Sequence, residues 1–83
     1  MAISYRQIRN LPARAIIRAL LEDGFSLRRQ KGSHQRYVHS DGRRVTVTVH
    51  KPSDTFPIKT LKSIVERQAR WSEDYLVRLK LIK

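Results

Sequence analysis

The 83-residue chain predicts a single α+β domain, in which a helix, three antiparallel strands, a second helix and a short last helix follow one another. Two kinds of apolar spacing support this prediction: helical spacing towards both ends of the chain, and alternation with polar residues in the middle. The pair Asp41-Gly42 interrupts the alternating stretch, as expected for a hairpin. We therefore expect a three-stranded antiparallel sheet with the helices packed on one face and the other face open.

The first helix is predicted to begin at Leu11, with Pro12 in its first turn, and to end at Gly24. Its apolar stripe consists of Ile16, Ile17, Leu20 and Leu21. Residues 1–10 are weakly patterned, so we expect a weakly ordered N-terminal segment, followed by one domain over residues 11–83.

Three strands are expected after this helix. Phe25 and Leu27 alternate with polar residues, which indicates a half-buried first strand. The second strand is predicted over residues 33–39 and the third over residues 44–50. The third strand should face the core with Val45, Val47 and Val49, and the opposite face with Arg44, Thr46, Thr48 and His50.

The length of the hairpin loop decides which face of the sheet carries His34. A two-residue turn would place His34 on the face of the core valines. A three-residue loop with Gly42 in the left-handed conformation instead pairs Tyr37 with Val45, which buries the tyrosine ring and leaves His34 and Arg36 facing outwards. We predict the three-residue loop, because burying an arginine without a partner is costly.

The last two helices follow a loop over residues 51–57. Thr60 is predicted to cap the N-terminus of the second helix, and Ser72 that of the short last helix. Glu73 and Asp74 suit the positive end of the last helix dipole. The inward-facing residues are predicted to be Leu61, Ile64 and Val65 in the second helix and Tyr75, Leu76 and Leu79 in the last, with Ile58 near the beginning of the second helix and Trp71 packed between the two.

The formal net charge is +11, which is high for this length and indicates a polyanionic partner. A basic membrane-surface peptide would need one long amphipathic helix, and the strand pattern argues against it. The chain has no apolar run long enough to span a bilayer, no visible secretory signal and no cysteine. We therefore expect a cytoplasmic protein that binds no membrane.

A run of basic residues surrounds His34, since residues 28–37 read Arg-Arg-Gln-Lys-Gly-Ser-His-Gln-Arg-Tyr. Imidazole suits proton transfer near neutral pH, because its unperturbed pKa is about 6.5. Guanidinium and ammonium groups bind phosphate. Together they supply what metal-free cleavage of RNA requires. The competing interpretation is a solvated or partly packed histidine in a basic strand, and composition alone favours it.

The predicted hairpin region carries seven basic residues against one acid, Asp41. Such a cluster repels itself unless an anion neutralises it, so we predict salt-sensitive binding to RNA phosphates. Ser33 is interpreted as a turn residue within this cluster rather than a nucleophile. The predicted RNA-binding residues are Arg28, Arg29, Lys31, Ser33, Arg36, Arg43, Arg44 and Lys51.

Other catalytic chemistries find little support. The three histidines lack the spacing of metal ligands, and the acidic pairs at residues 22–23 and 73–74 are interpreted as helix-end residues. No Gly-x-Ser-x-Gly motif is present. We therefore expect no metal and no small-molecule cofactor. His50 is a secondary candidate for proton transfer or a structural hydrogen bond, His39 is a surface or packing residue, and Tyr37 is more a core residue than a platform for base stacking.

Several motifs, taken in order, resemble the HicA family of toxin ribonucleases. They are a helix ending in Gly24-Phe25, the run from Arg29 to His34, a basic hairpin and a valine-rich strand that ends in a histidine. Tyr37 is the aromatic residue three positions after the histidine, Asp41-Gly42 lies in the hairpin, and the valine-rich strand runs from Val45 to His50. A helix with the pattern Thr-Leu-x-x-Ile follows, in Thr60-Leu61 with Ile64. The resemblance runs from about Leu11 to Leu79.

This resemblance implies a small toxin that cleaves mRNA and is silenced by a HicB-type antitoxin, which would mask His34 and the basic face. It implies a fold like that of double-stranded RNA-binding domains, with His34 as the catalytic residue. The chain departs from the family pattern at two places. The third strand lacks its usual proline, and Arg70 occupies a turn that usually holds a glycine, which predicts a positive φ at Arg70.

Two alternative functions remain open from the sequence. One is a non-catalytic double-stranded RNA-binding module of the same fold, which the composition fits equally well. The other is a small DNA-binding or ribosome-associated protein, which would explain the charge but not the Gly-Ser-His motif. The setting of His34 favours the endoribonuclease.

Overall fold

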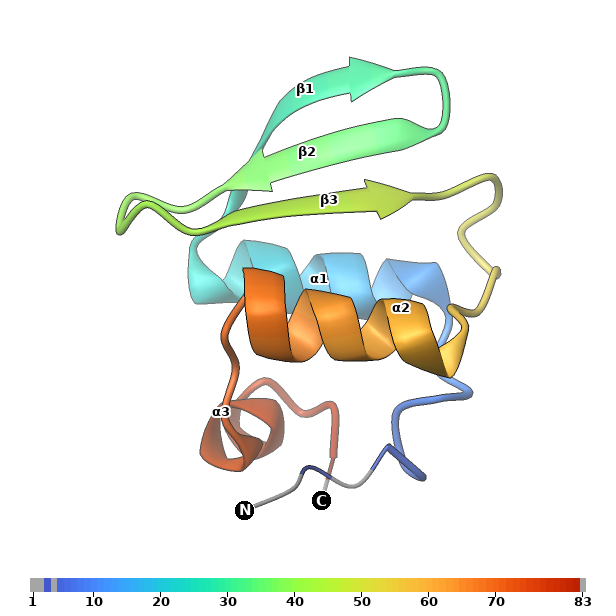
Figure 1. The fold of residues 1–83 in the computed structure, drawn as a ribbon, viewed down its shortest axis with the longest axis vertical. Coiled ribbons are helices and arrows are strands. Elements are labelled where there is room, and N and C mark those ends of the chain that lie inside the picture. Colours follow the sequence, from blue (N-terminus) through green and yellow to red (C-terminus); the bar gives the residue numbers. More distant parts are fainter. Residues whose placement is uncertain (1–2, 4, 83) are drawn as a thin grey trace.

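The computed structural model describes residue 3 and residues 5–82. The element order confirms the predicted α+β fold, with an antiparallel three-stranded sheet (Figure 1). The elements are α1 (Ala13–Asp23), β1 (Ser26–Lys31), β2 (His34–Val38), β3 (Arg44–Thr48), α2 (Ile58–Lys62), the π-helical turn η1 (Ser63–Gln68) that continues α2, and α3 (Glu73–Arg78).

The molecule is layered. The helices α1 and α2 lie side by side under one face of the sheet, and α3 lies on the far side of them (Figure 1). The strand order is β1-β2-β3, so β1 and β3 form the two edges. None of the helices in the described part of the chain has the length and apolar character needed to cross a membrane.

The hairpin between β2 and β3 has the predicted register. Tyr37 pairs with Val45, and Gly42 has a φ of 98°. The loop is closed by hydrogen bonds from the His39 N–H to the Arg43 carbonyl (2.9 Å) and from the Gly42 N–H to the His39 carbonyl (3.0 Å). The ring of Tyr37 is therefore buried, with 3% of its surface exposed, and the neighbouring even-numbered residues of β2 face away from the core.

Helix α1 begins two residues later than predicted, because Pro12 is its extended N-cap rather than part of its first turn. The first N–H groups of the helix donate to the loop before α2, from Ala13 to the Asp54 carbonyl (2.6 Å) and from Arg14 to the Pro52 carbonyl (3.0 Å). This satisfies donors that a side-chain cap would otherwise bind. The helix ends at Gly24, as predicted, with a φ of 108°.

Two leucines predicted on buried faces are exposed. Leu21 is 52% exposed, because the core face of α1 consists of Ala13, Ile16, Ala19 and Leu20. Leu27 is 45% exposed, because the pairing of β1 with β2 shifts between Leu27 and Arg29 and all six residues of β1 are exposed. Phe25 is buried as predicted, but it precedes the strand.

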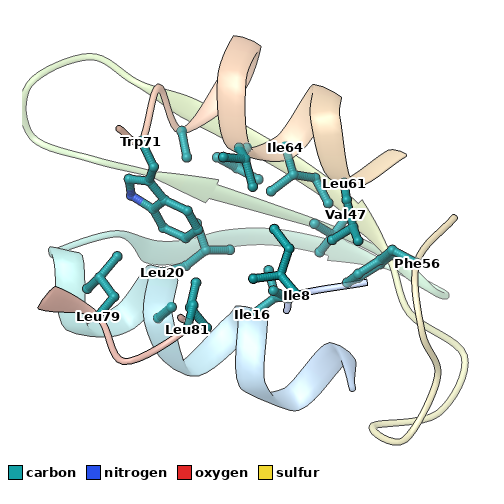
Figure 2. Packing of buried hydrophobic residues seen from close by; sticks show 14 of the residues in the cluster. Ile8, Ile16, Leu20, Val47, Phe56, Leu61, Ile64, Trp71, Leu79 and Leu81 are labelled. Atoms are coloured by element: carbon teal, nitrogen blue, oxygen red, sulfur yellow. The ribbon is translucent and has the colours of Figure 1, made fainter. Parts of the chain in front are cut away.

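The core fills the space between the sheet and the two helices. Val47 from β3 faces Leu61 and Ile64 from α2 and η1, while Trp71 packs towards Leu20 of α1 (Figure 2). Val45 is also fully buried and Val49 is half-buried. Among the described residues no charged or polar residue is buried, so the core cluster is wholly hydrophobic.

Part of the N-terminal segment also belongs to the core. Ile8 is fully buried, and Tyr5 packs against the cluster while its hydroxyl donates a hydrogen bond to Glu66. Burial, reinforced by that bond, raises the pKa of Tyr5. Within the segment expected to be weakly ordered, residues 1, 2 and 4 lie outside the described part of the chain.

The second helix does not begin with a threonine cap. Thr60 lies inside α2, which starts at Ile58 after the N-cap Pro57, so the prediction for Thr60 was wrong. Proline fixes the backbone just before a helix without any side-chain hydrogen bond. The prediction for Ser72 is confirmed, since its Oγ accepts from the Tyr75 N–H (3.3 Å) at the start of α3.

The turn after η1 shows the predicted backbone strain. Arg70 has a φ of 56°, in the left-handed region that glycine favours. The Trp71 N–H donates back to the Val65 carbonyl (2.7 Å), six residues earlier, and so closes the π-helical end of η1. This turn directs the chain from η1 to α3 and buries Trp71, which is 2% exposed.

Candidate nucleic-acid interface and catalytic histidine

The open face of the sheet brings two cross-strand rows of side chains together. Residues that pair across antiparallel strands share a face. The first row runs from Lys31 on β1 through His34 on β2 to Thr48 on β3. The second row consists of Arg29, Arg36 and Thr46. The sheet therefore places a histidine, three cations and two hydroxyls on one surface, opposite the hydrophobic core.

The tight turn before His34 fixes its position. Lys31 and His34 flank a two-residue turn in which Gly32 has a φ of 58°, and a pair that closes such a turn is hydrogen-bonded. The backbone N–H and carbonyl of His34 therefore point towards β1. On its other side His34 forms a non-hydrogen-bonded pair with Thr48 of β3, in which side chains approach more closely. The Ser33 carbonyl accepts from the Val49 N–H (2.8 Å), which ties the turn to β3.

A shallow depression of about 210 Å³ lies over these rows. Its lining consists of Arg29, Lys31, His34, Gln35, Arg36 and Thr46. Within residues 3 and 5–82, the imidazole of His34 makes no hydrogen bond or ion pair, and its residue is exposed. The ring is thus available to a ligand that enters the depression.

Tyr37 does not belong to this surface. Its ring faces the core, and its hydroxyl donates to Gln35 Oε1 (2.7 Å). Burial raises the pKa of Tyr37. The structure therefore supports Tyr37 as a core residue and gives it no surface on which a base can stack.

The remaining predicted residues lie around the two rows. Arg28 is the unpaired residue at the register shift of β1, and Arg44 lies at the far end of β3 from Thr48. His50 and Lys51 follow β3, and their N–H groups both donate to Asp54 Oδ2, at 3.2 and 2.9 Å. The side chains of these four residues are exposed.

Arg43 lies apart from the others, because its guanidinium points to the helices. Nη1 donates to Asp23 Oδ2 (3.0 Å) and to the Ala69 carbonyl (2.6 Å), while Nε donates to Asp41 Oδ2 (2.7 Å). Burial lowers the pKa of Arg43, but the bonds to Asp41 and Asp23 raise it more, so the net shift is upwards. The side chain is only 12% exposed and also stacks on the ring of Phe25.

The sequence alone did not reveal this partly buried network. Asp23 also accepts a hydrogen bond from Trp71 Nε1 (2.9 Å), so one carboxylate joins α1 to the β2–β3 hairpin and to the turn before α3. One signal was available: an aspartate in the last turn of a helix opposes the helix dipole, so it requires another partner.

His39 is a packing residue, in agreement with the prediction. Its Nε2 lies 2.8 Å from the Asp23 carbonyl, and its Nδ1 accepts from the Asp41 N–H (3.1 Å). Asp41 Oδ1 also lies 3.1 Å from Nδ1, so both ring nitrogens have polar partners. The ring also meets Phe25 edge to face, with centroids 5.1 Å apart.

The electrostatic character of the open face is one-sided. Asp41 is the single acid between residues 26 and 53, and its carboxylate is held by Arg43. The Arg43 N–H and then the guanidinium hold the pKa of Asp41 below its ordinary value. In the part of the chain that the structure describes, no three His, Cys, Asp or Glu side chains gather in a way that could hold a metal ion.

Comparison with known proteins supplies the family. A family model described as the HicA toxin of bacterial toxin–antitoxin systems matches residues 13–71, which include α1, the whole sheet and the turn at Arg70. No curated protein matches the chain. The matched region covers more than half of the sequence and contains the cationic rows around His34. The chain belongs to the HicA family of toxins of bacterial toxin–antitoxin systems.

Proposed function

We propose that this HicA-family chain is an endoribonuclease that cleaves mRNA without a metal ion, with His34 as the catalytic residue. The observation that carries the proposal is the position of His34: an exposed imidazole paired with Lys31 on one side and Thr48 on the other, on an open sheet face that holds no acid. Family membership agrees with a toxic activity of this kind.

RNA supplies its own nucleophile, which suits a site of this composition. The ribose 2′-oxygen attacks the adjacent phosphorus, the bond from phosphorus to the 5′-oxygen breaks, and a 2′,3′-cyclic phosphate and a 5′-hydroxyl result. His34 Nε2 or Nδ1 accepts the proton of the 2′-hydroxyl as general base, and water or His50 donates a proton to the departing 5′-oxygen. Positioned acid–base catalysis of this kind is worth about 100- to 10,000-fold.

The cations beside His34 would stabilise the charge that develops on the phosphorus centre. Lys31 is the cross-strand partner of His34, and Arg36 lies two residues further along β2 on the same face. Arg29, which pairs with Arg36, completes the group. Donors of fixed position that face a developing oxyanion commonly contribute more than any other single effect in catalysis.

The wider basic surface would bind the RNA backbone. Its proposed contact residues are Arg28, Arg29, Lys31, Ser33, Arg36, Arg44 and Lys51, with His50 beside them. Arg43 leaves the predicted set, because its guanidinium is held by Asp41 and Asp23. Recognition through phosphates and 2′-hydroxyls is the expected mode for a fold like that of double-stranded RNA-binding domains.

The natural partner in this proposal is a HicB-like antitoxin that covers His34 and the basic face. An acidic surface would be drawn to a chain of formal net charge +11 at a high rate and would displace RNA by occupying the same cations. By covering the depression over His34, such a partner would block access of RNA to the imidazole and to the cations beside it.

The deciding experiment measures RNA cleavage in EDTA by the wild type and by His34→Ala, together with binding of the same RNA. Because His34 is exposed and makes no internal hydrogen bond among the described residues, its removal should leave the thermal midpoint unchanged. We expect cleavage to fall by about 100-fold or more, with RNA affinity reduced by less than about threefold, since the phosphate-binding cations remain.

The control is His50→Ala, which removes the exposed imidazole that follows β3. We expect it to lower the rate far less than His34→Ala. Equal cleavage by His34→Ala and the wild type would refute the catalytic assignment. Tight, salt-sensitive RNA binding without cleavage by either protein would favour the non-catalytic RNA-binding module instead.

A further inference from the structure

A second basic hollow lies at the end of the sheet away from His34. It has a volume of about 320 Å³ and is formed by the β2–β3 hairpin and the end of η1. The residues that line it are Asp41, Gly42, Arg43, Arg44, Arg67, Gln68 and Arg70. Arg67 and Arg70 belong to neither of the cross-strand rows around His34.

The free charge of this hollow is entirely positive. Its one acid, Asp41, already binds the Arg43 N–H (3.0 Å) and the Arg43 Nε (2.7 Å). Arg44, Arg67 and Arg70 are exposed, and within the described residues their guanidinium groups form no ion pair or hydrogen bond. Three unpaired arginines around one depression repel one another unless an anion binds between them.

The backbone presents Arg70 to the hollow in spite of strain. Arg70 has a φ of 56°, where a side chain is disfavoured and glycine is not. Only the backbone is needed for the turn, because the Trp71 N–H makes the closing bond to the Val65 carbonyl. A glycine would therefore serve the fold better, and the arginine side chain requires another reason.

Gln68 joins the end of η1, which lines this hollow, to strand β3. Gln68 Oε1 accepts from the Thr46 N–H on β3 (2.8 Å), and its Nε2 donates to Ser63 Oγ (3.0 Å). The end of η1 is thereby fixed beside the strand whose outer face carries Arg44, Thr46 and Thr48. Arg44 lines the hollow and also belongs to this outer face, so the two surfaces meet at Arg44.

We propose that Arg44, Arg67 and Arg70 form a second phosphate-binding site, which holds the backbone of an RNA strand a few nucleotides away from the bond that faces His34. This inference rests on the proposed RNA cleavage. Arg44 lies four residues from Thr48 along β3, which corresponds to about 13 Å at strand rise. The bound phosphate is therefore distinct from the one cleaved, and guanidinium groups suit it by their bidentate geometry.

The sharpest test uses Arg70→Gly, because it should affect folding and binding in opposite directions. Relief of the left-handed backbone strain should raise the thermal midpoint by about 2–6 °C. Loss of the guanidinium should weaken binding of a short 2′-O-methyl RNA, which lacks the attacking hydroxyl, by about fivefold at 0.1 M salt. The slope of log Kd against log salt should fall by about 0.7.

The matched control is Lys80→Gly. Lys80 is also basic, exposed and left-handed, with a φ of 62°. It follows α3, the helix that α1 and α2 separate from the sheet (Figure 1). It should leave the RNA affinity unchanged within about twofold. The double variant Arg44→Gln/Arg67→Gln should lower the salt slope by about twice as much as Arg70→Gly.

Each other outcome overturns the inference in a recognisable way. Equal weakening by Arg70→Gly and Lys80→Gly would show a general charge effect rather than a site. Unchanged RNA binding with a weaker antitoxin complex would assign the hollow to a protein partner. Failure of the wild type itself to bind RNA would refute the proposed function, whereas tight binding that ignores Arg70, Arg67 and Arg44 would refute this site alone.

Discussion

The network around Asp23 makes a quantitative prediction about stability. Asp23 Oδ2 accepts from Trp71 Nε1 (2.9 Å) and Arg43 Nη1 (3.0 Å). The side chains of Asp23 and Arg43 are 9% and 12% exposed, so water cannot replace the lost partner easily. The variant Asp23→Ala leaves the indole N–H unbonded, at a cost of about 1–3 kcal/mol.

The same change leaves the Arg43 charge short of one partner. Breaking a fully buried ion pair costs about 3–5 kcal/mol. Here the cost should be smaller, because Arg43 keeps Asp41 Oδ2 at 2.7 Å and the Ala69 carbonyl at 2.6 Å. The two effects together predict that Asp23→Ala lowers the free energy of unfolding by about 3 kcal/mol.

Urea unfolding, followed by Trp71 fluorescence and circular dichroism, measures this loss through the midpoint at constant m. The control Asp23→Asn has the same shape and keeps one acceptor for the indole, so its cost should be about half that of Asp23→Ala. RNA affinity should not change, since Arg43 points away from the open face. A loss below about 1 kcal/mol for Asp23→Ala, or reduced RNA affinity, would refute the structural role assigned to this network.

Two further predictions concern the same end of the sheet. Gly24→Ala should cost about 2–3 kcal/mol, because the φ of 108° disfavours a side chain and the new Cβ would lie 2.9 Å from His39 Nε2; Gly42→Ala, with a φ of 98° and nothing within 4 Å, should cost less, and equal losses in urea unfolding would exclude the clash. Asp41 has a lowered folded pKa, so its stabilising effect exists above its unfolded pKa of about 3.9 and disappears as pH falls through the folded value. Asp41→Asn should therefore flatten the dependence of the unfolding free energy on pH below about 4, and an unchanged acid slope would contradict that reasoning.

The position of the candidate histidine could be predicted because one local choice determined it. Burying Tyr37 rather than Arg36 required a three-residue hairpin loop, and a sheet of period two then placed His34 on the open face. The same alternation failed at Leu27. Alternation in the sequence does not show how far the helices extend beneath the sheet. The helices do not cover β1, so Leu27 is exposed.

The assignments that failed or were missed depend on contacts between distant segments. Arg43 appears in the sequence as one more cation of a basic hairpin, but Asp23 and Trp71, which decide its orientation, lie in other elements. Thr60 had the right chemistry for a cap, but Pro57 had already set the start of α2. Local sequence patterns predict the type of each element and which of its residues face the core. The partners of a polar side chain, by contrast, depend on the arrangement of distant segments in the fold.

The two edges of the sheet also govern how the molecule behaves beside other copies of itself. An unpaired strand edge is a template for further strands, and charged side chains are a common protection. The β3 edge has its Thr46 N–H occupied by Gln68, while the β1 edge carries Arg28, Arg29 and Lys31. Two such β1 edges would bring like charges together, so growth of the sheet is opposed. The cations of the β1 edge thus oppose edge-to-edge pairing of two copies, and a sequence that lost them would be more prone to self-association.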